Sequence, residues 1–356
     1  MLVNKTIFHR LAGVGLFVTA CALGPLGTSP VARAQDIQQE KVVIAHRGAS
    51  GYLPEHTLAA KALAYGMRAD YIEQDVVLSK DGVPVILHDI HLDTTTDVAA
   101  RFPDRKREDG RYYAIDFTLA EIKSLNVTER FKTDSGKQVY ENRFPMDFGM
   151  FKVPTLEEEI KMVRGLNHST GRDVGIYTEI KDPAFHREEG VDISAAVIAV
   201  LEKWGYNNPD SNSFVQCFDW AETKRIRNEL NYQGKLVQLL GENRWGPPEG
   251  TDYDYLKSED GITEMARVVD GIGPWLPQVI TGLSENGSAV VTPTLIAAQR
   301  AQLLVHPYTL RADQLPKWAG DMDIALKAIF DDAGIDGIFT DFPDQAVQYL
   351  ARNPDA

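Results

Sequence analysis

Short apolar runs alternate with longer amphipathic stretches along most of the chain, and this alternation predicts its architecture. The apolar runs lie at residues 42–45, 71–78, 174–177, 214–215, 236–240, 268–272, 303–305 and 337–339. Helix-like segments separate them, at about 57–66, 155–168, 191–204, 220–230, 259–267, 292–300, 320–333 and 343–352. Near-continuous apolar strands separated by helices are typical of a parallel sheet covered by helices, so eight such units predict an α/β fold, a (β/α)8 TIM barrel. A doubly wound open sheet is the alternative.

One interval interrupts this rhythm after the second strand. Residues 83–87 form an apolar run that we expect to pair with the second strand through the turn Lys80-Asp81-Gly82. Residues 90–153 then lack regular alternation and are rich in Asp, Arg, Thr and aromatic residues. Because a long irregular connection in a compact domain is usually functional or disordered, we expect an insertion at about 90–153 that partly covers the barrel mouth. The barrel domain is expected to span residues 41–352.

The first 34 residues have the pattern of a secretory signal peptide. Lys5 and Arg10 precede an apolar stretch at 11–26, and Ala32-Arg33-Ala34 provides a cleavage site. This stretch is too short and too interrupted by Gly and Pro for a stable membrane span, so no transmembrane span is expected in the mature chain. The prediction is therefore a periplasmic or secreted protein. Lipidation of Cys21, which would give a membrane-anchored lipoprotein, is the alternative; cleavage after Ala34 is preferred because Cys21 lies inside the apolar run.

Charge and cysteine content narrow the possible partners. The chain has 37 basic and 51 acidic residues and a formal net charge of −14. Residues 1–34 hold three basic residues and no acid, so the mature chain has 34 basic and 51 acidic residues and a net charge of −17. This charge repels nucleic acid and anionic membranes, so a polyanionic partner is not expected. A small anionic substrate would need local positive charge, either from a metal ion or from a few placed cations. Cleavage leaves Cys217 alone, so the core must hold the fold without an internal disulfide.

Polar side chains follow several of the apolar runs at the same predicted end. The residues are His46, Arg47 and Gly48 at the first strand, Glu73 and Asp75 at the second, His88 and Asp89 after the hairpin, Glu179 and Lys181 at the third, and Thr340 and Asp341 at the last. Reactive groups of a (β/α)8 barrel lie at the C-terminal ends of its strands. We therefore expect these side chains to share one site.

Three of these residues have the chemistry of a metal site. Glu73 and Asp75 are two apart on a strand, so they project to one face, where two carboxylates repel each other unless a cation or proton lies between them. Glu179 on the neighbouring strand can supply a third oxygen ligand. Three carboxylates with no Cys or His nearby favour a hard cation, Ca²⁺ or Mg²⁺, over zinc. The alternative is that these acids pair with Lys or Arg in a structural network.

His46 and His88 are the candidates for proton transfer. Cleavage of a phosphate ester removes a proton from the attacking oxygen and delivers one to the leaving oxygen, and two imidazoles can do both near neutral pH. Arg47 can hold two phosphate oxygens at once. Asp89 either orients His88 or caps the turn. For each histidine the alternative is a hydrogen-bonded core residue.

Other residues near the predicted mouth carry weaker signals. His306-Pro307-Tyr308 follows the seventh strand, where a simple turn is the preferred interpretation. Phe218 follows the fourth strand and could line an apolar wall. The remaining histidines in loops and helix flanks are given no role: His56, His91, His168 and His186.

Several segments resemble the motifs of one enzyme family. The segment Ala45-His46-Arg47-Gly48-Ala49-Ser50-Gly51-Tyr52-Leu53-Pro54-Glu55-His56-Thr57 resembles the opening motif of the glycerophosphodiester phosphodiesterase family, most closely its periplasmic bacterial branch. Later motifs of the family are similar to Glu73-Gln74-Asp75, Leu87-His88-Asp89, Thr178-Glu179-Ile180-Lys181 and Phe339-Thr340-Asp341-Phe342-Pro343-Asp344. The resemblance runs from about Lys41 to Leu350, and this set of motifs in this order is highly specific.

The resemblance implies a fold, a reaction and a set of site residues. The fold is a (β/α)8 barrel with an insertion after the second strand. The reaction is metal-dependent hydrolysis of glycerophosphodiesters, such as glycerophosphocholine and glycerophosphoethanolamine, to sn-glycerol 3-phosphate and an alcohol. The resemblance implies that His46 and His88 are the acid–base pair. It implies that Glu73, Asp75 and Glu179 coordinate one divalent ion, Ca²⁺ in preference to Mg²⁺. Arg47 and Lys181 are then the phosphate contacts, and Glu55 supports these groups from behind.

One mechanism and two rival functions follow as hypotheses. The glycerol 2-hydroxyl is a ready internal nucleophile, and water would then open the cyclic phosphate; which histidine is the acid stays open. One rival is a related barrel phosphodiesterase that cuts phosphoinositides or sphingomyelin, which would need an apolar, membrane-docking mouth. The other is an exported binding protein that keeps the barrel without the catalysis, which could lose a ligand without harm.

Overall fold

The computed structural model describes residues 41–146 and 149–354, and a parallel barrel dominates them. Nine of the described strands form one sheet, in the order β10-β7-β6-β5-β4-β2-β1-β11, with β3 paired antiparallel to β2. The eight parallel strands are β1 (Val42–Ala45), β2 (Tyr71–Leu78), β4 (Gly175–Ile180), β5 (Ser213–Cys217), β6 (Lys235–Leu240), β7 (Gly271–Pro274), β10 (Leu304–Val305) and β11 (Gly337–Thr340). The predicted (β/α)8 barrel is confirmed. The predicted signal peptide, with Cys21, lies outside the described residues.

The barrel is closed by the segment after β10, because β10 itself has only two residues. Leu310 forms a parallel bridge with Thr340. The Leu310 N–H donates to the Phe339 carbonyl at 2.9 Å, and the Phe339 N–H donates to the Pro307 carbonyl at 3.0 Å. The chain from residue 307 to 311 is thereby fixed beside the C-terminal end of β11.

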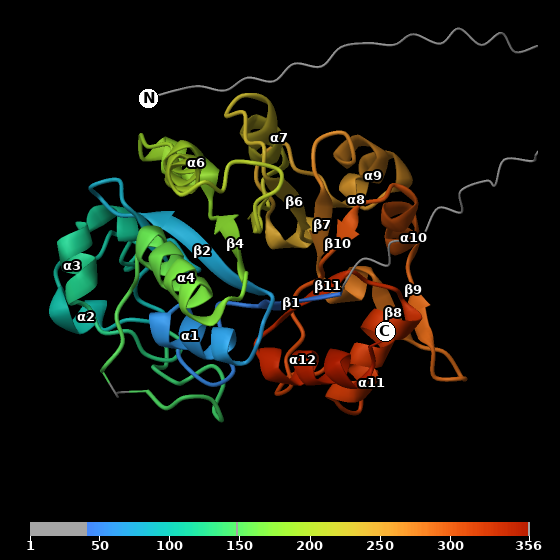
Figure 1. Cartoon of the computed structure of the whole chain (residues 1–356). Helices are drawn as coiled ribbons and strands as arrows, with labels where there is room; N and C mark the ends of the chain where they lie inside the picture. The colour runs from blue at the N-terminus through green and yellow to red at the C-terminus, as the bar shows by residue number, and fades with distance from the viewer. Residues whose placement is uncertain (1–40, 147–148, 355–356) are drawn as a thin grey trace, which may run out of the picture. The chain divides into compact units, whose positions relative to one another are not determined.

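Helices cover the outside of the barrel at the predicted places (Figure 1). They are α1 (Leu58–Gly66), α4 (Leu156–Thr170), α6 (Ile193–Lys203), α7 (Trp220–Asn228), α9 (Glu259–Met265), α10 (Pro293–Arg300), α11 (Met322–Lys327) and α12 (Pro343–Arg352). Side chains fix their starts: Thr57 accepts from the Ala60 N–H, and Thr155 forms a reciprocal cap with Glu158. The predicted helix at 320–333 is α11 followed by a π-helical turn at 328–332.

Aromatic side chains fill the inside of the barrel. The buried cluster there consists of Ile44, Tyr71, Tyr177, Phe214, Val237 and Phe339, one from each of six strands. Tyr177 stacks on Phe214 with ring centroids 4.6 Å apart and meets Phe339 edge-on at 4.9 Å. Packed layers of large side chains make such a barrel a solid core, so the polar residues beyond this layer lie on a rigid floor.

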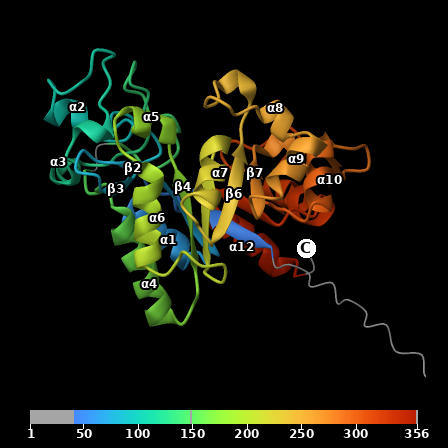
Figure 2. The same ribbon diagram turned by 90° about the horizontal axis from the view of Figure 1, so that it is seen from above.

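The insertion after β3 (Pro84–Ile86) folds over a small core of its own. It contains α2 (Val98–Arg101), a 3-10 turn at Ala114–Asp116 and α3 (Leu119–Ser124). Buried residues such as Leu92, Phe117 and Ile122 pack together with Val77 and Val85 of the barrel. Figure 2 shows α2 and α3 on the same side as α5 (Pro183–Glu188), and stacking of Tyr113 on Phe185, with centroids 5.5 Å apart, joins the two.

The pattern of the sequence did not indicate three short elements. These are α5, α8 (Tyr253–Leu256) and the hairpin of β8 (Ile280–Leu283) with β9 (Ala289–Val291).

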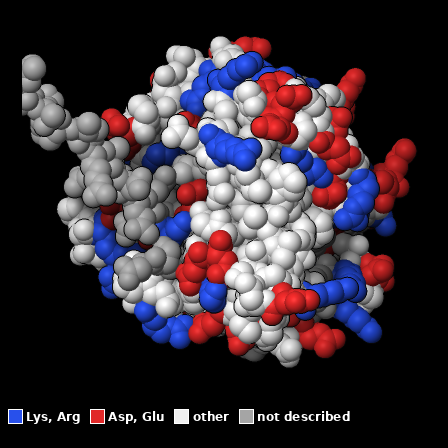
Figure 3. Space-filling model, turned by 90° about the vertical axis from the view of Figure 1, so that its right-hand side faces the viewer, with Lys and Arg blue, Asp and Glu red and all other residues white. Residues whose placement is uncertain are grey.

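On the face that carries α10 and this hairpin, basic and acidic side chains are interspersed around a wide uncharged band (Figure 3). Among the described helices, none is long and apolar enough to cross a membrane.

Candidate active site

The site begins at the tight turn that ends β1. Arg47 and Gly48 both have left-handed backbone conformations, with φ of 58° and 85°. A Cβ at Gly48 would lie 2.8 Å from the carbonyl carbon of Ala60, so only glycine lets α1 pack this close to the turn. The turn places His46 and Arg47 at the C-terminal end of the barrel, where both line a cavity with about 660 Å³ of empty space.

His46 is held by a buried carboxylate from the other end of the chain. Its Nδ1 lies 2.6 Å from Oδ1 of Asp341, which follows β11. Oδ2 of Asp341 accepts from Arg143 at 2.7 Å and from Arg311 at 2.8 Å. Burial opposes ionisation, but Arg311, His46 and Arg143 hold the pKa of Asp341 well below its usual range. An ionised Asp341 accepts the Nδ1 proton, which leaves Nε2 of His46 as the free proton acceptor.

His88 has the same arrangement with a nearer partner. Its Nδ1 lies 2.6 Å from Oδ1 of Asp89, and Oδ2 of Asp89 accepts from Thr94 at 2.7 Å and from Arg130 at 2.6 Å. Asp89 therefore orients His88, which was one of its two predicted roles. Burial, then Arg47, lowers the pKa of His46 to about 4, and burial, Arg47 and Lys181 lower the pKa of His88 to about 4. Both imidazoles line the same cavity and are neutral at pH 7.

The predicted metal-binding acids are buried at this end of β2 and β4. Glu73 and Asp75 lie on β2, and Asp75 is paired in register with Glu179 of β4. Burial and then the charge of Asp75 raise the pKa of Glu73 well above its usual range. Burial also raises the pKa of Glu179 to about 8, with Lys181 opposing the shift and Asp75 adding to it. The three carboxylates thus repel one another in a low-dielectric site.

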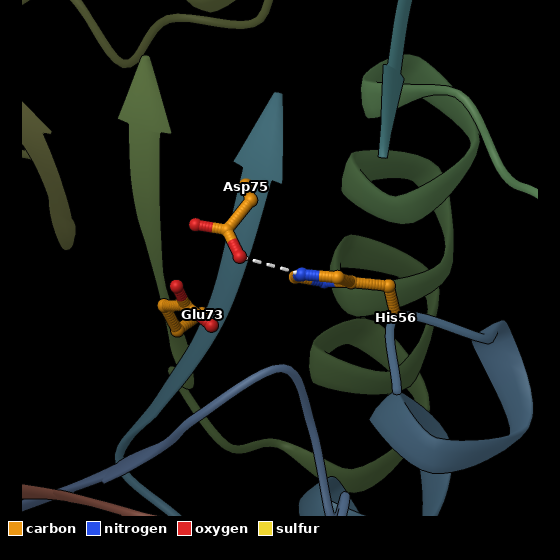
Figure 4. Close-up of side chains that lie close together, drawn as sticks. All are labelled: His56, Glu73 and Asp75. Carbon is orange, nitrogen blue, oxygen red and sulfur yellow. Dashed lines mark hydrogen bonds and ion pairs between the residues drawn. The ribbon is translucent and has the colours of Figure 1, made fainter. Parts of the chain in front are cut away.

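His56 joins this cluster, contrary to the expectation from the sequence. Its Nε2 lies 2.7 Å from Oδ2 of Asp75. The potential ligand atoms of His56, Glu73 and Asp75 all lie within 4.8 Å of one another (Figure 4). The expectation that no histidine lies near these acids was wrong: His56, whose own backbone has a φ of 63°, reaches Asp75 with its ring. Burial lowers the pKa of His56 to about 3, so the neutral ring donates to Asp75.

These residues fit a divalent cation. Oδ1 of Asp75 is buried and has no hydrogen-bond partner, so its lone pairs are available to a cation. Glu73 and Glu179 both line the cavity, and burial, together with the charge of Asp75, raises the pKa of each. A bound cation would favour the ionised form of both carboxyls. Carboxylate oxygens are the donors that Ca²⁺ and Mg²⁺ prefer, and the imidazole of His56 is already hydrogen-bonded to Asp75 through Nε2.

Ion pairs connect the remaining predicted residues, Arg47, Glu55 and Lys181, to their neighbours. Arg47 donates from Nη1 to both oxygens of Glu55 at 3.1 Å, and its Nε lies 3.6 Å from Oδ2 of Asp75. Arg130 of the insertion also donates to both oxygens of Glu55, at 2.9 and 2.6 Å. Lys181 donates to Oε1 of Glu179 at 2.6 Å. Glu55 is therefore placed behind Arg47, and Lys181 beside Glu179.

Sequence reasoning missed the arginines that surround the site. Arg130 and Arg143 come from the insertion and Arg311 from the segment that closes the barrel, and all three line a cavity with His46 and His88. The insertion thus contributes a wall to the mouth. Its richness in arginine was the one available signal, since loops have no periodicity that would show which side chains turn inward.

His306 does not belong to the mouth. The ring is buried in the barrel, with its Nδ1 3.1 Å from the hydroxyl of Tyr177. Burial, then Lys235, lowers the pKa of His306 to about 3. Two residues on, Tyr308 lines the cavity. The motif His306-Pro307-Tyr308 is therefore more than a turn: it supplies one side chain to the core and one to the site.

Comparison with known proteins decides the family. The model of the glycerophosphoryl diester phosphodiesterase family matches residues 46–345. The chain belongs to this family. It is 44% identical over 330 residues to the glycerophosphodiester phosphodiesterase of Haemophilus influenzae, covering 88% of this chain and 91% of that one. It is 39% identical over 329 residues to the glycerophosphodiester phosphodiesterase of Treponema pallidum, covering 88% and 92%.

Solved structures agree with the barrel. A phosphodiesterase of Oleispira antarctica, in complex with the product sn-glycerol-3-phosphate, superposes with a TM-score of 0.58 at 22% identity, covering 87% of this chain and 96% of that one. At this identity the likeness concerns the fold. Together with the family match, it places the chain among the (β/α)8 enzymes of the glycerophosphoryl diester phosphodiesterase family.

Proposed function

We propose that this chain hydrolyses glycerophosphodiesters, such as glycerophosphocholine and glycerophosphoethanolamine, to sn-glycerol 3-phosphate and an alcohol. The observation that carries the proposal is one cavity lined by two imidazoles, His46 and His88, each backed by a carboxylate, and by the acids Glu73 and Glu179. The relatives at 44% and 39% identity bear the name of this activity over most of their length.

Glu73, Asp75 and Glu179 would hold one divalent ion, with Ca²⁺ preferred over Mg²⁺. When bound, such an ion supplies positive charge that offsets the charge of the phosphate oxygens and lowers the pKa of an attacking hydroxyl. Arg47 and Lys181 supply further positive charge at the phosphate. Glu55 and Arg130 keep the guanidinium of Arg47 in position.

His46 and His88 move the protons. One neutral imidazole accepts the proton of the attacking oxygen, for which the glycerol 2-hydroxyl is the proposed nucleophile. The other must carry a proton to the leaving alkoxide. Because an anionic diester beside it favours the imidazolium, substrate binding raises the pKa of that histidine from its depressed value. Water then opens the cyclic phosphate with the two roles exchanged.

The histidines are tested by single substitution. His46→Ala and His88→Ala should each lower kcat for glycerophosphocholine by at least ~100-fold, the usual contribution of general acid–base catalysis. His168→Ala, an exposed histidine on α4, is the matched control and should keep wild-type turnover. Near-normal turnover in both active-site variants would reject the assignment. Release of sn-glycerol 3-phosphate is the measurement.

Chelation tests the metal. Treatment with EDTA should abolish turnover, and added Ca²⁺ should restore it more fully than Mg²⁺. Glu73→Gln should raise the half-saturating concentration of the restoring ion, because the loss of an anionic ligand weakens binding of the ion. Turnover that is indifferent to EDTA would rule out the metal site.

Intact phospholipids, assayed as parallel substrates, distinguish this activity from that of the rival barrel phosphodiesterase, which would cut phosphoinositides or sphingomyelin.

Export completes the proposal. We infer a periplasmic or secreted enzyme whose signal peptide ends at Ala34, supported by the pattern of residues 1–34. Mass spectrometry of the mature protein should find Gln35 as the first residue. A lipidated Cys21 at the N-terminus would replace this proposal with a membrane anchor.

A further inference from the structure

Three cavities meet at His88, and they differ in chemical character. The first, here called the aromatic cavity, is lined by Phe218, Trp245, Trp275 and Tyr308 in addition to the catalytic groups. The second, the arginine cavity, is lined by Arg47, Arg130, Arg143 and Arg311. The third lies between β4 and the insertion and has a mixed lining that includes Lys181, Asp182 and Arg111. A phosphodiester has two arms, so the character of these cavities decides which alcohol the site accepts.

Four separate loops build the wall of the aromatic cavity. Phe218 follows β5, Trp245 ends a 3-10 turn after β6, Trp275 follows β7 and Tyr308 follows β10. The rings meet edge to face, with centroids 5.4 Å apart for Trp245 and Trp275 and 5.7 Å apart for Phe218 and Tyr308. Trp245 is 45% exposed, so it is not simply part of the core.

The polar atom of one ring is already used. The hydroxyl of Tyr308 donates to the carbonyl of Leu240 at 2.7 Å, and Phe218 has no polar atom. These two residues therefore offer aromatic carbon rather than hydrogen bonds to an occupant. Electron-rich ring faces of this kind attract cations, and several rings around one cavity are the arrangement that recognises quaternary ammonium groups.

The walls of the two cavities differ more than their charges do. Arg47 and Arg311 line both cavities, and each is paired with a carboxylate, Glu55 and Asp341 respectively. The arginine cavity adds two further arginines, whereas the aromatic cavity adds four uncharged rings. A cationic arm therefore meets ring faces in the aromatic cavity and more guanidinium groups in the arginine cavity.

We propose that the aromatic wall of Phe218, Trp245, Trp275 and Tyr308 binds the trimethylammonium group of a choline diester and makes the enzyme prefer quaternary ammonium alcohols over neutral ones. This inference rests on the proposed function, because it assigns the alcohol arm of the same substrate. The phosphate lies at the catalytic end of the cavity, and the cationic head lies against the rings.

The test compares two esters of the same shape. Glycerophosphocholine and its carbon isostere, the 3,3-dimethylbutyl ester of glycerol phosphate, differ only in the positive charge; glycerophosphoglycerol serves as a third substrate. Wild-type enzyme should show kcat/KM for the choline ester higher than for the isostere by about 3-fold to about 30-fold, the range expected for a cation over aromatic rings. Trp245→Leu and Trp275→Leu should bring this ratio close to one, and the matching Phe variants should retain part of it.

Trp204→Leu is the matched control, since Trp204 lies at the end of α6 away from the cavity, and it should leave the ratio unchanged. A wild-type ratio of one, or a ratio that both Leu variants preserve, overturns the inference while the proposed function stands. No turnover with any of the three esters overturns the proposed function and the inference together.

Discussion

At the residue scale, the site repeats one device twice: an imidazole whose Nδ1 is held by a carboxylate. His46 takes its carboxylate from Asp341, nearly 300 positions away, and His88 takes it from the next residue. In both cases the carboxylate is itself fixed by an arginine of the insertion. The tautomer is thus set before substrate arrives, and Nε2 of each ring remains free for proton transfer.

Replacing Asp341 by Asn should therefore disturb catalysis more than stability. The amide can donate to Nδ1 of His46 and so stabilise the wrong tautomer, and we expect a loss of at least ~100-fold in kcat/KM with a displaced lower limb of the pH–rate profile. Asp313→Asn is the control, because Asp313 shares Arg143 with Asp341 but does not contact His46. Equal activity in the two variants would contradict the positioning role of Asp341.

The sequence indicated the strand-end residues of this site but not their neighbours. Two rules made these residues predictable: side chains alternate between the two faces of a strand, and the C-terminal ends of parallel barrel strands lie together. They apply to His46, Glu73, Asp75 and Glu179. His56 was not, since its inward direction depends on a positive φ that no pattern in the sequence shows.

At the element scale, the pattern located the parallel strands and their helices to within a few residues. The largest error is β7, predicted at 268–272 and observed at Gly271–Pro274. Val268 and Val269 are apolar, but their N–H groups complete hydrogen bonds to Met265 at the end of α9. The β8–β9 hairpin was missed although Asn286-Gly287 is a turn signal and Gly287 has φ of 82°.

Helix α5 contains a histidine that links stability to pH. Nε2 of His186 accepts the Leu78 N–H at 3.1 Å, and its Nδ1 lies 3.0 Å from the Asp182 carbonyl. The contact with Leu78 needs the neutral ring, because Nε2 must accept there, whereas Nδ1–H donates to the Asp182 carbonyl in either protonation state. Burial lowers the pKa of His186. The unfolded chain, with a pKa near ~6.5, therefore binds a proton more readily than the folded one.

The stabilisation by this ring is present above pH ~6.5 and is lost as pH falls from there toward the lower folded-state pKa. We expect the free energy of unfolding of the wild type to fall between pH 7.5 and pH 5.5, and to fall less in His186→Gln. Denaturant unfolding at both pH values measures this difference. An identical decrease in both proteins would show that His186 does not contribute.

At the scale of the whole molecule, cationic side chains gather at the mouth although the chain as a whole is acidic. The chain has a formal net charge of −14, yet five cationic side chains surround the mouth: Arg47, Arg130, Arg143, Lys181 and Arg311. Net charge argued against polyanionic partners at the level of sequence, but it could not show this clustering, because three of the five cations come from loops without periodicity.

The bridge made by Arg130 has a consequence for how this enzyme can change. Its guanidinium donates hydrogen bonds to Glu55 and to Asp89. Glu55 also accepts from Arg47, and Asp89 also contacts the ring of His88. The effects of substitutions at positions 55, 89 and 130 are consequently coupled. A substitution at one of them alters the effect of substitutions at the other two, so these positions are best varied jointly.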